Sequence, residues 1–159
     1  MMGSGKSSAG QIAAGHLGAP FYDTDLEIEA TAEMAIGEIF TALGEPEFRK
    51  IETSIIDRLA GLVAVVATGG GAVLDRDNVE KMRNTGPVVL LQASASALID
   101  RLGDPVGRPL LDAGPPRENL IAIVEERHHL YATAASDVID TEHLDLPEVA
   151  RRIEQLWNS

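Results

Sequence analysis

Met1-Met2-Gly3-Ser4-Gly5-Lys6-Ser7, the first seven residues, is the stretch on which the interpretation of the whole chain depends. It matches the phosphate-loop pattern G-x-x-x-x-G-K-[S/T] from the four variable positions to the end, and the leading glycine would stand just before Met1. Glycines in such a loop let backbone N–H groups turn towards a phosphate, Lys6 adds a positive charge, and the Ser7 hydroxyl suits Mg²⁺. The sequence therefore predicts a phosphate-binding site, and a Gly/Ser-rich tail with a chance lysine is the alternative.

The residues after the loop alternate between helix and strand patterns. Ala9, Ile12 and Leu17 recur at helical spacing, and Gly18 ends that helix. Short apolar runs predict four strands, at residues 20–22, 63–67, 88–91 and 137–140. Helices are predicted in pieces over 26–60, and at 77–83, 94–102, 118–131 and from 147. This alternation is typical of an α/β fold with a doubly wound parallel sheet, and a phosphate loop normally follows a further strand, here expected before Met1.

The composition limits the classes of protein to which the chain can belong. Its 159 residues, 45% hydrophobic and 24% charged, predict one domain with a substantial core. The absence of cysteine excludes disulfides and thiolate metal sites. A net charge of −12 argues against nucleic acid or an anionic membrane as a partner. No apolar run approaches the ~20 residues of a membrane span and no secretion signal is recognisable, so we expect a cytoplasmic protein.

Two aspartates directly follow the first predicted strand, in the segment Asp23-Thr24-Asp25. Parallel α/β sheets bind their ligands at the carboxyl ends of the strands, so Asp23 and Asp25 are expected at a ligand site. A solvated turn is the alternative, because aspartate is common in turns.

Three further segments are compatible either with binding a small anionic ligand or with an ordinary protein surface. Arg49 lies three residues before Glu52 on a predicted helix, which also fits an exposed ion pair. Gly69-Gly70-Gly71 follows the strand at 63–67, where glycines let a ligand approach the backbone or simply form a flexible turn. The glycine- and proline-rich segment from 103 to 117 is expected to be either a mobile flap or a passive surface loop.

Taken together, these features resemble the shikimate kinase family, a group of small P-loop phosphotransferases. The resemblance runs nearly from end to end and rests on six motifs in the same order: Gly3-Ser4-Gly5-Lys6-Ser7, Asp23-Thr24-Asp25, Phe48-Arg49-Lys50-Ile51-Glu52, Gly69-Gly70-Gly71, Arg108-Pro109-Leu110-Leu111, and Glu126-Arg127 before Leu130-Tyr131. It implies transfer of the γ-phosphoryl group of ATP to the 3-hydroxyl of shikimate, a step of aromatic amino-acid biosynthesis.

The resemblance also implies an architecture. This is a three-layer, doubly wound parallel sheet of the P-loop, nucleoside-monophosphate-kinase-like type with strand order 2-3-1-4-5, of which strand 1 is missing from this chain. Residues 1–159 would form a single kinase domain whose core comprises residues 1–23, 61–102 and 132–159. Residues 24–60 would form the substrate-binding region, and residues from about 103 to 117 a flap.

Carried over position by position, the resemblance implies a nucleotide site that uses ATP and Mg²⁺. The residues that would hold the nucleotide through backbone amides, hydroxyls and positive charges are Gly3, Ser4, Gly5, Lys6, Ser7, Ser8, Arg101 and Arg108. Ser7 would bind Mg²⁺, and Asp23 would support the metal through water. Arg101 would stack near the adenine, and Arg108 would close with the flap over the transferring phosphate.

The resemblance implies an acceptor site beside the nucleotide. The residues that would bind shikimate are Asp25, Arg49, Gly70, Gly71 and Arg127. The catalytic residues would be Lys6, Asp25 and Arg108, and Asp25 would either remove the hydroxyl proton or only orient the hydroxyl. The chemistry of the residues agrees, because arginines suit the carboxylate of shikimate and an aspartate suits its hydroxyls.

Several alternatives remain open. We expect the functional polypeptide to begin upstream of Met1, because the absent strand would be the central one; otherwise the chain would be unstable or inactive. Another small-metabolite kinase, such as a gluconate kinase, would share the architecture. A non-catalytic nucleotide-binding module would keep the loop without transferring phosphate. Whichever holds, the chain is expected to be a monomer.

Overall fold

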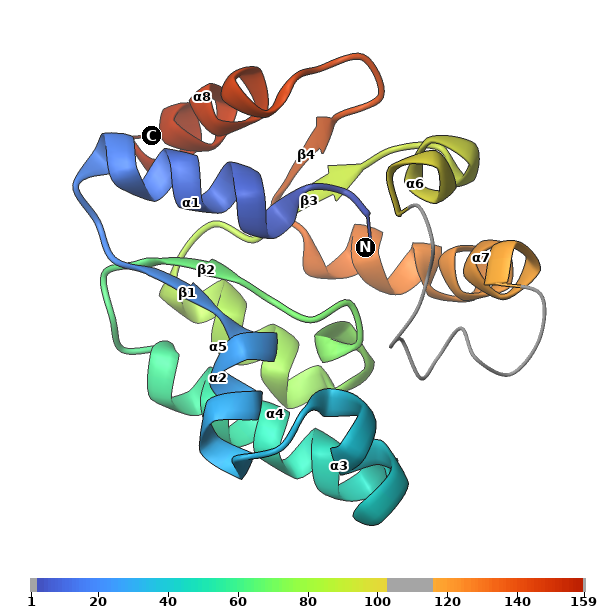
Figure 1. Cartoon of the computed structure of the whole chain (residues 1–159). Helices are drawn as coiled ribbons and strands as arrows, with labels where there is room; N and C mark the ends of the chain where they lie inside the picture. The colour runs from blue at the N-terminus through green and yellow to red at the C-terminus, as the bar shows by residue number, and fades with distance from the viewer. Residues whose placement is uncertain (1–2, 103–115, 159) are drawn as a thin grey trace.

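The computed structural model describes residues 3–102 and 116–158 and has an α/β fold with parallel strands (Figure 1). The four strands are short: β1 (Phe21–Asp23), β2 (Val65–Ala67), β3 (Val89–Gln92) and β4 (Asp137–Asp140). β1 pairs with β2, and β3 pairs with β4, both in parallel. In the predicted strand order 2-3-1-4-5, β1 and β2 correspond to strands 2 and 3, and β3 and β4 correspond to strands 4 and 5. Within the described part of the chain, no strand joins β2 to β3.

Helices connect and cover the strands. Their bounds are α1 (Lys6–Leu17), α2 (Thr24–Ala32), α3 (Ile36–Ala42), α4 (Glu45–Leu59), the 3₁₀ turn η1 (Ala72–Leu74), α5 (Arg76–Thr85), α6 (Ala95–Leu102), α7 (Pro116–Ala134) and α8 (Leu146–Trp157). Each predicted helix is present, and the pieces expected over 26–60 are α2, α3 and α4. Gly18 after α1 and Gly44 before α4 have φ angles of 63° and 81°, which glycine adopts without strain.

Several predicted boundaries differ from those of the structure, and two of the differences have a clear physical reason. The strand expected at 63–67 begins only at Val65, since this residue is opposite Phe21, the first residue of β1. Val63 precedes the paired segment and is 80% exposed. The flap expected over 103–117 overlaps α7, which begins at Pro116 because proline is well suited to the first turn of a helix. The rest of that segment, with Arg108, lies outside the described residues.

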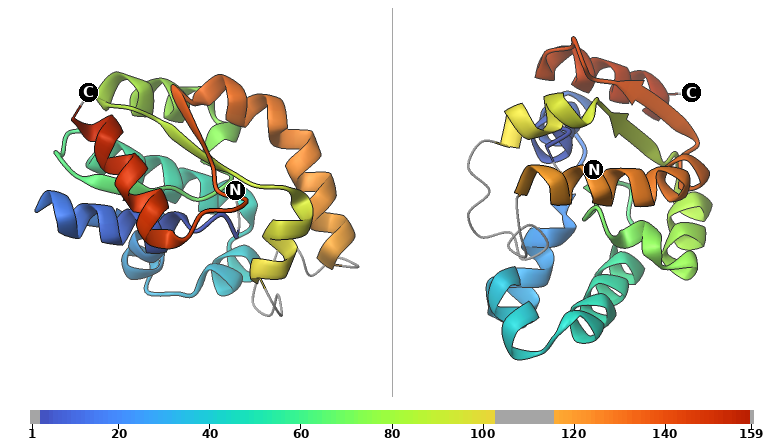
Figure 2. Two further views of the ribbon diagram at one scale, coloured as in Figure 1. Left: turned by 90° about the horizontal axis from the view of Figure 1, so that it is seen from above. Right: turned by 90° about the vertical axis from the view of Figure 1, so that its right-hand side faces the viewer.

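β3 separates two layers of helices. Leu91 is buried in a cluster with Ala9 of α1 and Val149 of α8. The preceding residue, Leu90, packs against a different cluster that contains Tyr131 of α7. Successive residues of a strand point to opposite faces of a sheet, so helices cover both faces of the β3–β4 pair. Figures 1 and 2 show α1 and α8 on one side of these strands and α7 on the other, in agreement with the predicted three layers.

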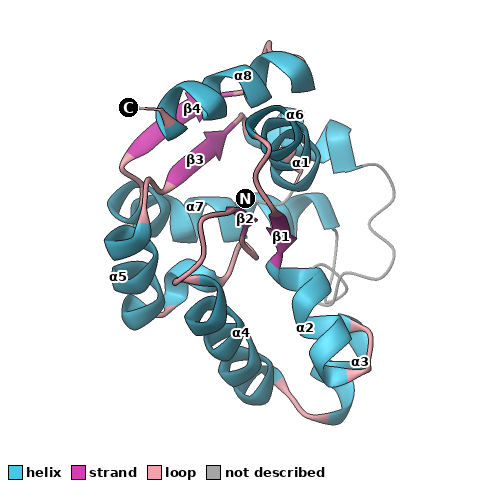
Figure 3. Cartoon of the chain, turned by 90° about the vertical axis from the view of Figure 1, so that its left-hand side faces the viewer, coloured by secondary structure: helices cyan, strands magenta, loops and turns pink. Residues whose placement is uncertain are grey.

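A third hydrophobic cluster holds α2, α3 and α4 together. It contains Ile28, Ile39, Phe48 and Ile55, and Tyr22 of β1 packs against it. Figure 3 shows these three helices at one end of the molecule, next to the β1–β2 pair. The cluster lies within residues 24–60, whose role as the substrate-binding region remains a prediction. Among the helices that the structure describes, none has the length and apolar character needed to cross a membrane.

Candidate active site

The phosphate loop enters α1 with the backbone geometry that its glycines predict. Gly3 and Gly5 have φ angles of 73° and 84°, in the left-handed region that residues with side chains rarely adopt. Gly5 is the N-cap of α1, and the first amides of a helix together carry a partial positive charge. Lys6 and Ser7 begin the helix at this end, so an anion such as a phosphate is favoured there.

Ser7 and Asp23 are brought together although sixteen residues separate them. The Ser7 hydroxyl donates a hydrogen bond to Oδ2 of Asp23 at 2.5 Å. The other oxygen, Oδ1, accepts from the backbone N–H of Asp25 at 3.0 Å and so caps α2. The described residues contain no cluster of three or more His, Cys, Asp or Glu side chains that could enclose a metal. A hydroxyl and a carboxylate oxygen instead suit Mg²⁺, which usually completes its shell with water and phosphate oxygens.

Asp25 occupies a partly buried position between charges of both signs. Its Oδ1 is so close to Gly69 that a Cβ placed on this glycine would lie 2.8 Å from it. Burial raises the pKa of Asp25 above the usual value of an aspartate, and Asp23 raises it further. The positive charges of Lys6 and Arg49 act in the opposite direction and lower the pKa of Asp25. A carboxylate with a raised pKa is suited to accept a proton from a hydroxyl.

The glycine segment after β2 is held by two hydroxyl groups that the sequence interpretation did not include in the site. Thr24 is fully buried, and its Oγ1 accepts the backbone N–H of Gly69 at 2.8 Å. Tyr131 donates its hydroxyl to the carbonyl oxygen of Gly70 at 2.9 Å. The backbone of this segment is therefore positioned by α2 on one side and α7 on the other. Thr24 stands between the two predicted aspartates, and this position was the available signal.

Arg49 and Glu52 form a pair that points into the molecule. Nη1 of Arg49 donates to Oε2 of Glu52 at 2.8 Å, and the Glu52 side chain is only 1% exposed. Burial raises the pKa of Glu52, and the hydrogen bond from Arg49 opposes this shift. Oε1 of Glu52 has no hydrogen-bond partner among the described residues. The alternative of an exposed surface pair was therefore wrong, because α4 turns this side towards the glycine segment.

Arg127 reaches the same region from α7. It is one of the few buried charged residues among those described, and no described residue forms a hydrogen bond with its Nε. Its charge lowers the pKa of Glu52 and opposes the upward shift that burial causes in the pKa of Tyr131. A buried guanidinium whose Nε has no hydrogen-bond partner among the described residues is suited to an anionic group of a ligand.

A pocket connects the phosphate loop to the glycine segment. Lys6, Gly69, Gly70 and Tyr131 all line it. The guanidinium of Arg49 contacts Gly71, where an added Cβ would overlap Nη1. The structure thus brings the predicted loop, acid, glycine and arginine residues into one region.

Of the remaining predicted site residues, the structure describes Ser4, Ser8 and Arg101. Ser4 is buried in the loop, and Ser8 is exposed on the first turn of α1. Arg101 donates to Oγ1 of Thr141 at 2.9 Å and to its carbonyl oxygen at 2.5 Å, which ties α6 to the segment after β4. The role of Arg101 near an adenine stays a prediction, as does the role of Arg108 outside the described residues.

Comparisons with known proteins agree on one family. A family model described as Shikimate kinase matches residues 2–157. A shikimate kinase of Symbiobacterium thermophilum is 42% identical over 156 residues, covering 96% of this chain and 90% of the relative. A shikimate kinase of Thermodesulfovibrio yellowstonii is 39% identical over 153 residues, covering 96% and 88%.

Solved structures give the same result. A shikimate kinase from Acinetobacter baumannii in complex with shikimate superposes with a TM-score of 0.93 at 35% identity, covering 98% of this chain and 87% of the other. A shikimate kinase from Bacteroides thetaiotaomicron has a TM-score of 0.88 at 31% identity, covering 99% and 94%.

Proposed function

The chain belongs to the shikimate kinase family and is an ATP-dependent kinase with shikimate as its substrate, and we propose that the residues gathered around Asp25 carry out this reaction. The observation that supports the proposal is the position of Asp25, partly buried against Gly69, where the positive charges of Lys6 and Arg49 both act on its carboxylate. Phosphoryl transfer needs positioned reactants and neutralised charge more than covalent help from the protein. This arrangement provides both.

The phosphate side of the site consists of the loop and the start of α1. We propose that the loop amides and Lys6 hold the phosphates of ATP and draw negative charge from the group in transfer. Ser7 and Asp23 would hold Mg²⁺, one through its hydroxyl and the other through water, and their hydrogen bond keeps the two oxygens adjacent. When bound, the metal would neutralise part of the charge on the phosphates.

The acceptor side consists of the glycine segment and two arginines. Arg49 and Arg127 would bind the carboxylate of shikimate, because Arg49 contacts Gly71 and the charge of Arg127 acts on Glu52 in the same region. The backbone of Gly70 and Gly71, which Tyr131 helps to position, would line the pocket. Asp25 would accept hydrogen bonds from the hydroxyls and receive or orient the proton of the one that attacks. Its raised pKa makes it a better proton acceptor than an ordinary aspartate.

The proposal also includes Arg108, Arg101 and the properties of the whole chain. Arg108 would stabilise the charge of the transferring phosphate, and Arg101 would lie beside the adenine from α6. One chain supplies groups to both the phosphate and the acceptor side, so we propose a monomer. The charge of −12 disfavours nucleic acid and anionic membranes as partners. A cytoplasmic location fits a kinase that draws on ATP.

An acceptor panel tests the proposed chemistry. With ATP and Mg²⁺, we expect phosphate transfer to shikimate and none to gluconate, and removal of Mg²⁺ by a chelator is expected to stop the transfer. The measurement is product formation by ³¹P NMR, with ATP binding measured in parallel. Transfer to gluconate but not to shikimate would contradict the acceptor assignment. ATP binding without transfer to either acceptor would favour a non-catalytic module.

Gly71→Ala tests whether Arg49 binds the acceptor. The new Cβ would overlap the guanidinium of Arg49, so the arginine must move, while the backbone at residue 71 is already in a helical conformation that alanine accepts. We expect KM for shikimate to rise about tenfold, the cost of one charged hydrogen bond, with little change in Tm. Gly61→Ala is the matched control, because a Cβ at that position meets nothing within 4 Å. An unchanged KM in Gly71→Ala would exclude Arg49 from the acceptor site.

A further inference from the structure

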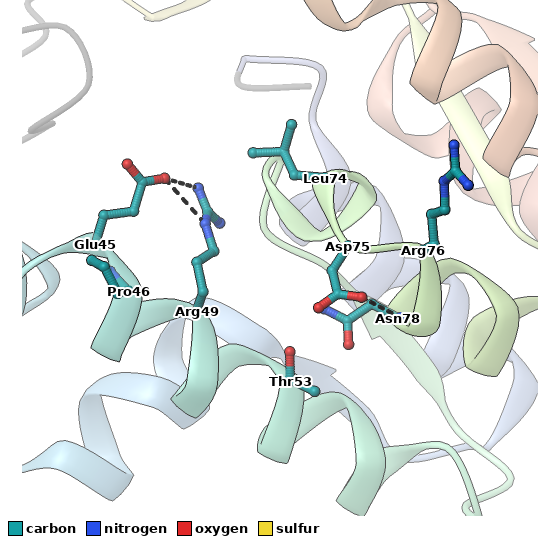
Figure 4. A pocket seen from close by; sticks show the side chains of 8 residues that line it. All are labelled: Glu45, Pro46, Arg49, Thr53, Leu74, Asp75, Arg76 and Asn78. Carbon is teal, nitrogen blue, oxygen red and sulfur yellow. Dashed lines mark hydrogen bonds and ion pairs between the residues drawn. The ribbon is translucent and has the colours of Figure 1, made fainter.

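Arg49 is held between two carboxylates of its own helix. Nε and Nη2 both donate to Oε1 of Glu45, at 3.2 and 2.8 Å, one turn before Arg49. Nη1 donates to Glu52, one turn after it. Figure 4 shows Glu45 and Arg49 side by side at the edge of a pocket, with both hydrogen bonds drawn. The Nε–Nη2 edge, the fork with which arginine binds a planar carboxylate, is therefore occupied by a residue of the protein.

The two carboxylates differ in how firmly they are held. Glu52 is almost fully buried, whereas the Glu45 side chain is 48% exposed. Exposed ion pairs contribute little, since water competes for both partners. Glu45 is thus the partner that another carboxylate can replace, while Glu52 keeps Arg49 oriented.

The space beside Glu45 allows its side chain to move away. Glu45 and Arg49 line a pocket of about 610 Å³ together with Thr53, Leu74 and Arg76. In Figure 4 the side chain of Leu74 stands across this pocket from Glu45, and Thr53 lies further along α4. A rotation of Glu45 about its own bonds is enough to release Arg49, with no change in α4.

We propose that Glu45 is an internal competitor for the carboxylate of shikimate and sets how selectively Arg49 binds acids. The inference rests on the proposed function, in which Arg49 binds that carboxylate. An incoming carboxylate must displace Glu45 from the fork, since otherwise three negative groups would surround one guanidinium. An uncharged acceptor cannot displace Glu45, because it offers the arginine no negative charge in exchange. Glu45 therefore reduces the affinity for shikimate and reserves Arg49 for planar acids.

Glu45→Gln tests this role, because glutamine keeps the shape and removes the charge. We expect the Kd of shikimate, measured by calorimetry without ATP, to fall about two- to fivefold, the range of an exposed ion pair. The methyl ester of shikimate, which lacks the negative charge, is expected to bind both proteins equally. Glu47→Gln is the matched control: it makes the same charge change in the same first turn, and Glu47 is 44% exposed and pairs with Lys50 rather than with Arg49.

Two results would overturn the inference. Unchanged or weaker binding of shikimate to Glu45→Gln would show that Glu45 positions Arg49 instead of competing for it. An equal gain in Glu47→Gln would show that only the net charge of α4 matters. Arg49→Lys, measured in parallel, separates the inference from its premise: unaltered shikimate binding in that variant would refute the proposed role of Arg49, whatever Glu45 does.

Discussion

Lys6→Met is expected to lower kcat at least 10²–10³-fold, about the loss seen when one preorganised group that stabilises the transition state is removed. Lys6 is the first residue of α1, next to the amides of the phosphate loop, and it lines the pocket that contains Gly69 and Gly70. Its charge also lowers the pKa of Asp25, so we expect it to act on both the phosphate and the acceptor side. Methionine keeps the length of the side chain and removes the charge.

The measurement is steady-state phosphorylation of shikimate, and Lys50→Met is the matched control. Lys50 lies on α4 in an exposed pair with Glu47, so its charge is far less important for transfer. The acid limb of any activity left in Lys6→Met should lie at a higher pH than in the wild type. The reason is that the variant lacks a cation that stabilises ionised Asp25 and lowers its pKa. A rate above one tenth of the wild type would contradict the role of Lys6.

Asp25→Asn is expected to reduce phosphate transfer about 10²–10⁴-fold, the usual effect of removing a general base, without loss of ATP binding. The wild-type kcat/KM is expected to fall on the acid side at a pH above the ordinary pKa of an aspartate, about 3.9, because the pKa of Asp25 is raised. This acid limb should disappear from the residual activity of Asp25→Asn. Wild-type rates in the variant would exclude Asp25 both as the base and as the main contact with the hydroxyls.

Asp25→Asn is also expected to leave the protein at least as stable as the wild type at neutral pH. The pKa of Asp25 is higher in the folded than in the unfolded chain, so the ionised form is disfavoured by folding. As pH falls from neutral through the folded pKa, the folded wild type takes up the proton first and gains stability relative to the variant. Tm measured from pH 7 down to pH 4 should therefore show the difference between the two proteins shrinking.

Asp57→Asn provides the contrast for both measurements. Asp57 forms an ion pair with Lys81 on the surface, and its side chain is 51% exposed. We expect this variant to keep its activity and to show no gain in stability at neutral pH. A Tm below that of the wild type in Asp25→Asn, with no such decrease in Asp57→Asn, would mean that ionised Asp25 stabilises the fold. This would contradict the direction of its pKa shift.

The local elements of the fold could be predicted because they depend on neighbouring residues. The helical spacing of Ala9, Ile12 and Leu17 gave α1, and the left-handed conformations of Gly3 and Gly5 follow from the loop pattern. The prediction failed where an element depends on a distant partner. Val63 belongs to an apolar run, but β1 offers no residue opposite it, so the strand starts later.

The candidate site was predictable in its residue types but not in its contacts. Asp23, Asp25 and Arg49 were assigned to the site from motifs. Thr24 and Tyr131 stand in two of the same motifs but were given no role, since a threonine and a tyrosine are ordinary core residues in a sequence. Thr24 holds the amide of Gly69, which is 45 residues away in the sequence. Tyr131 holds the carbonyl of Gly70, which is 61 residues away.

The sequence by itself determined the order of the elements, the phosphate loop and the family, because each of these is encoded in short patterns or in the identity of aligned residues. Only the tertiary structure decided which charges meet. The bond between Ser7 and Asp23, the raised pKa of Asp25 and the burial of Glu52 beside Arg49 depend on how α1, α2 and α4 pack at the ends of the strands. Burial and distance control these interactions, and neither quantity is written in the spacing of residues along the chain.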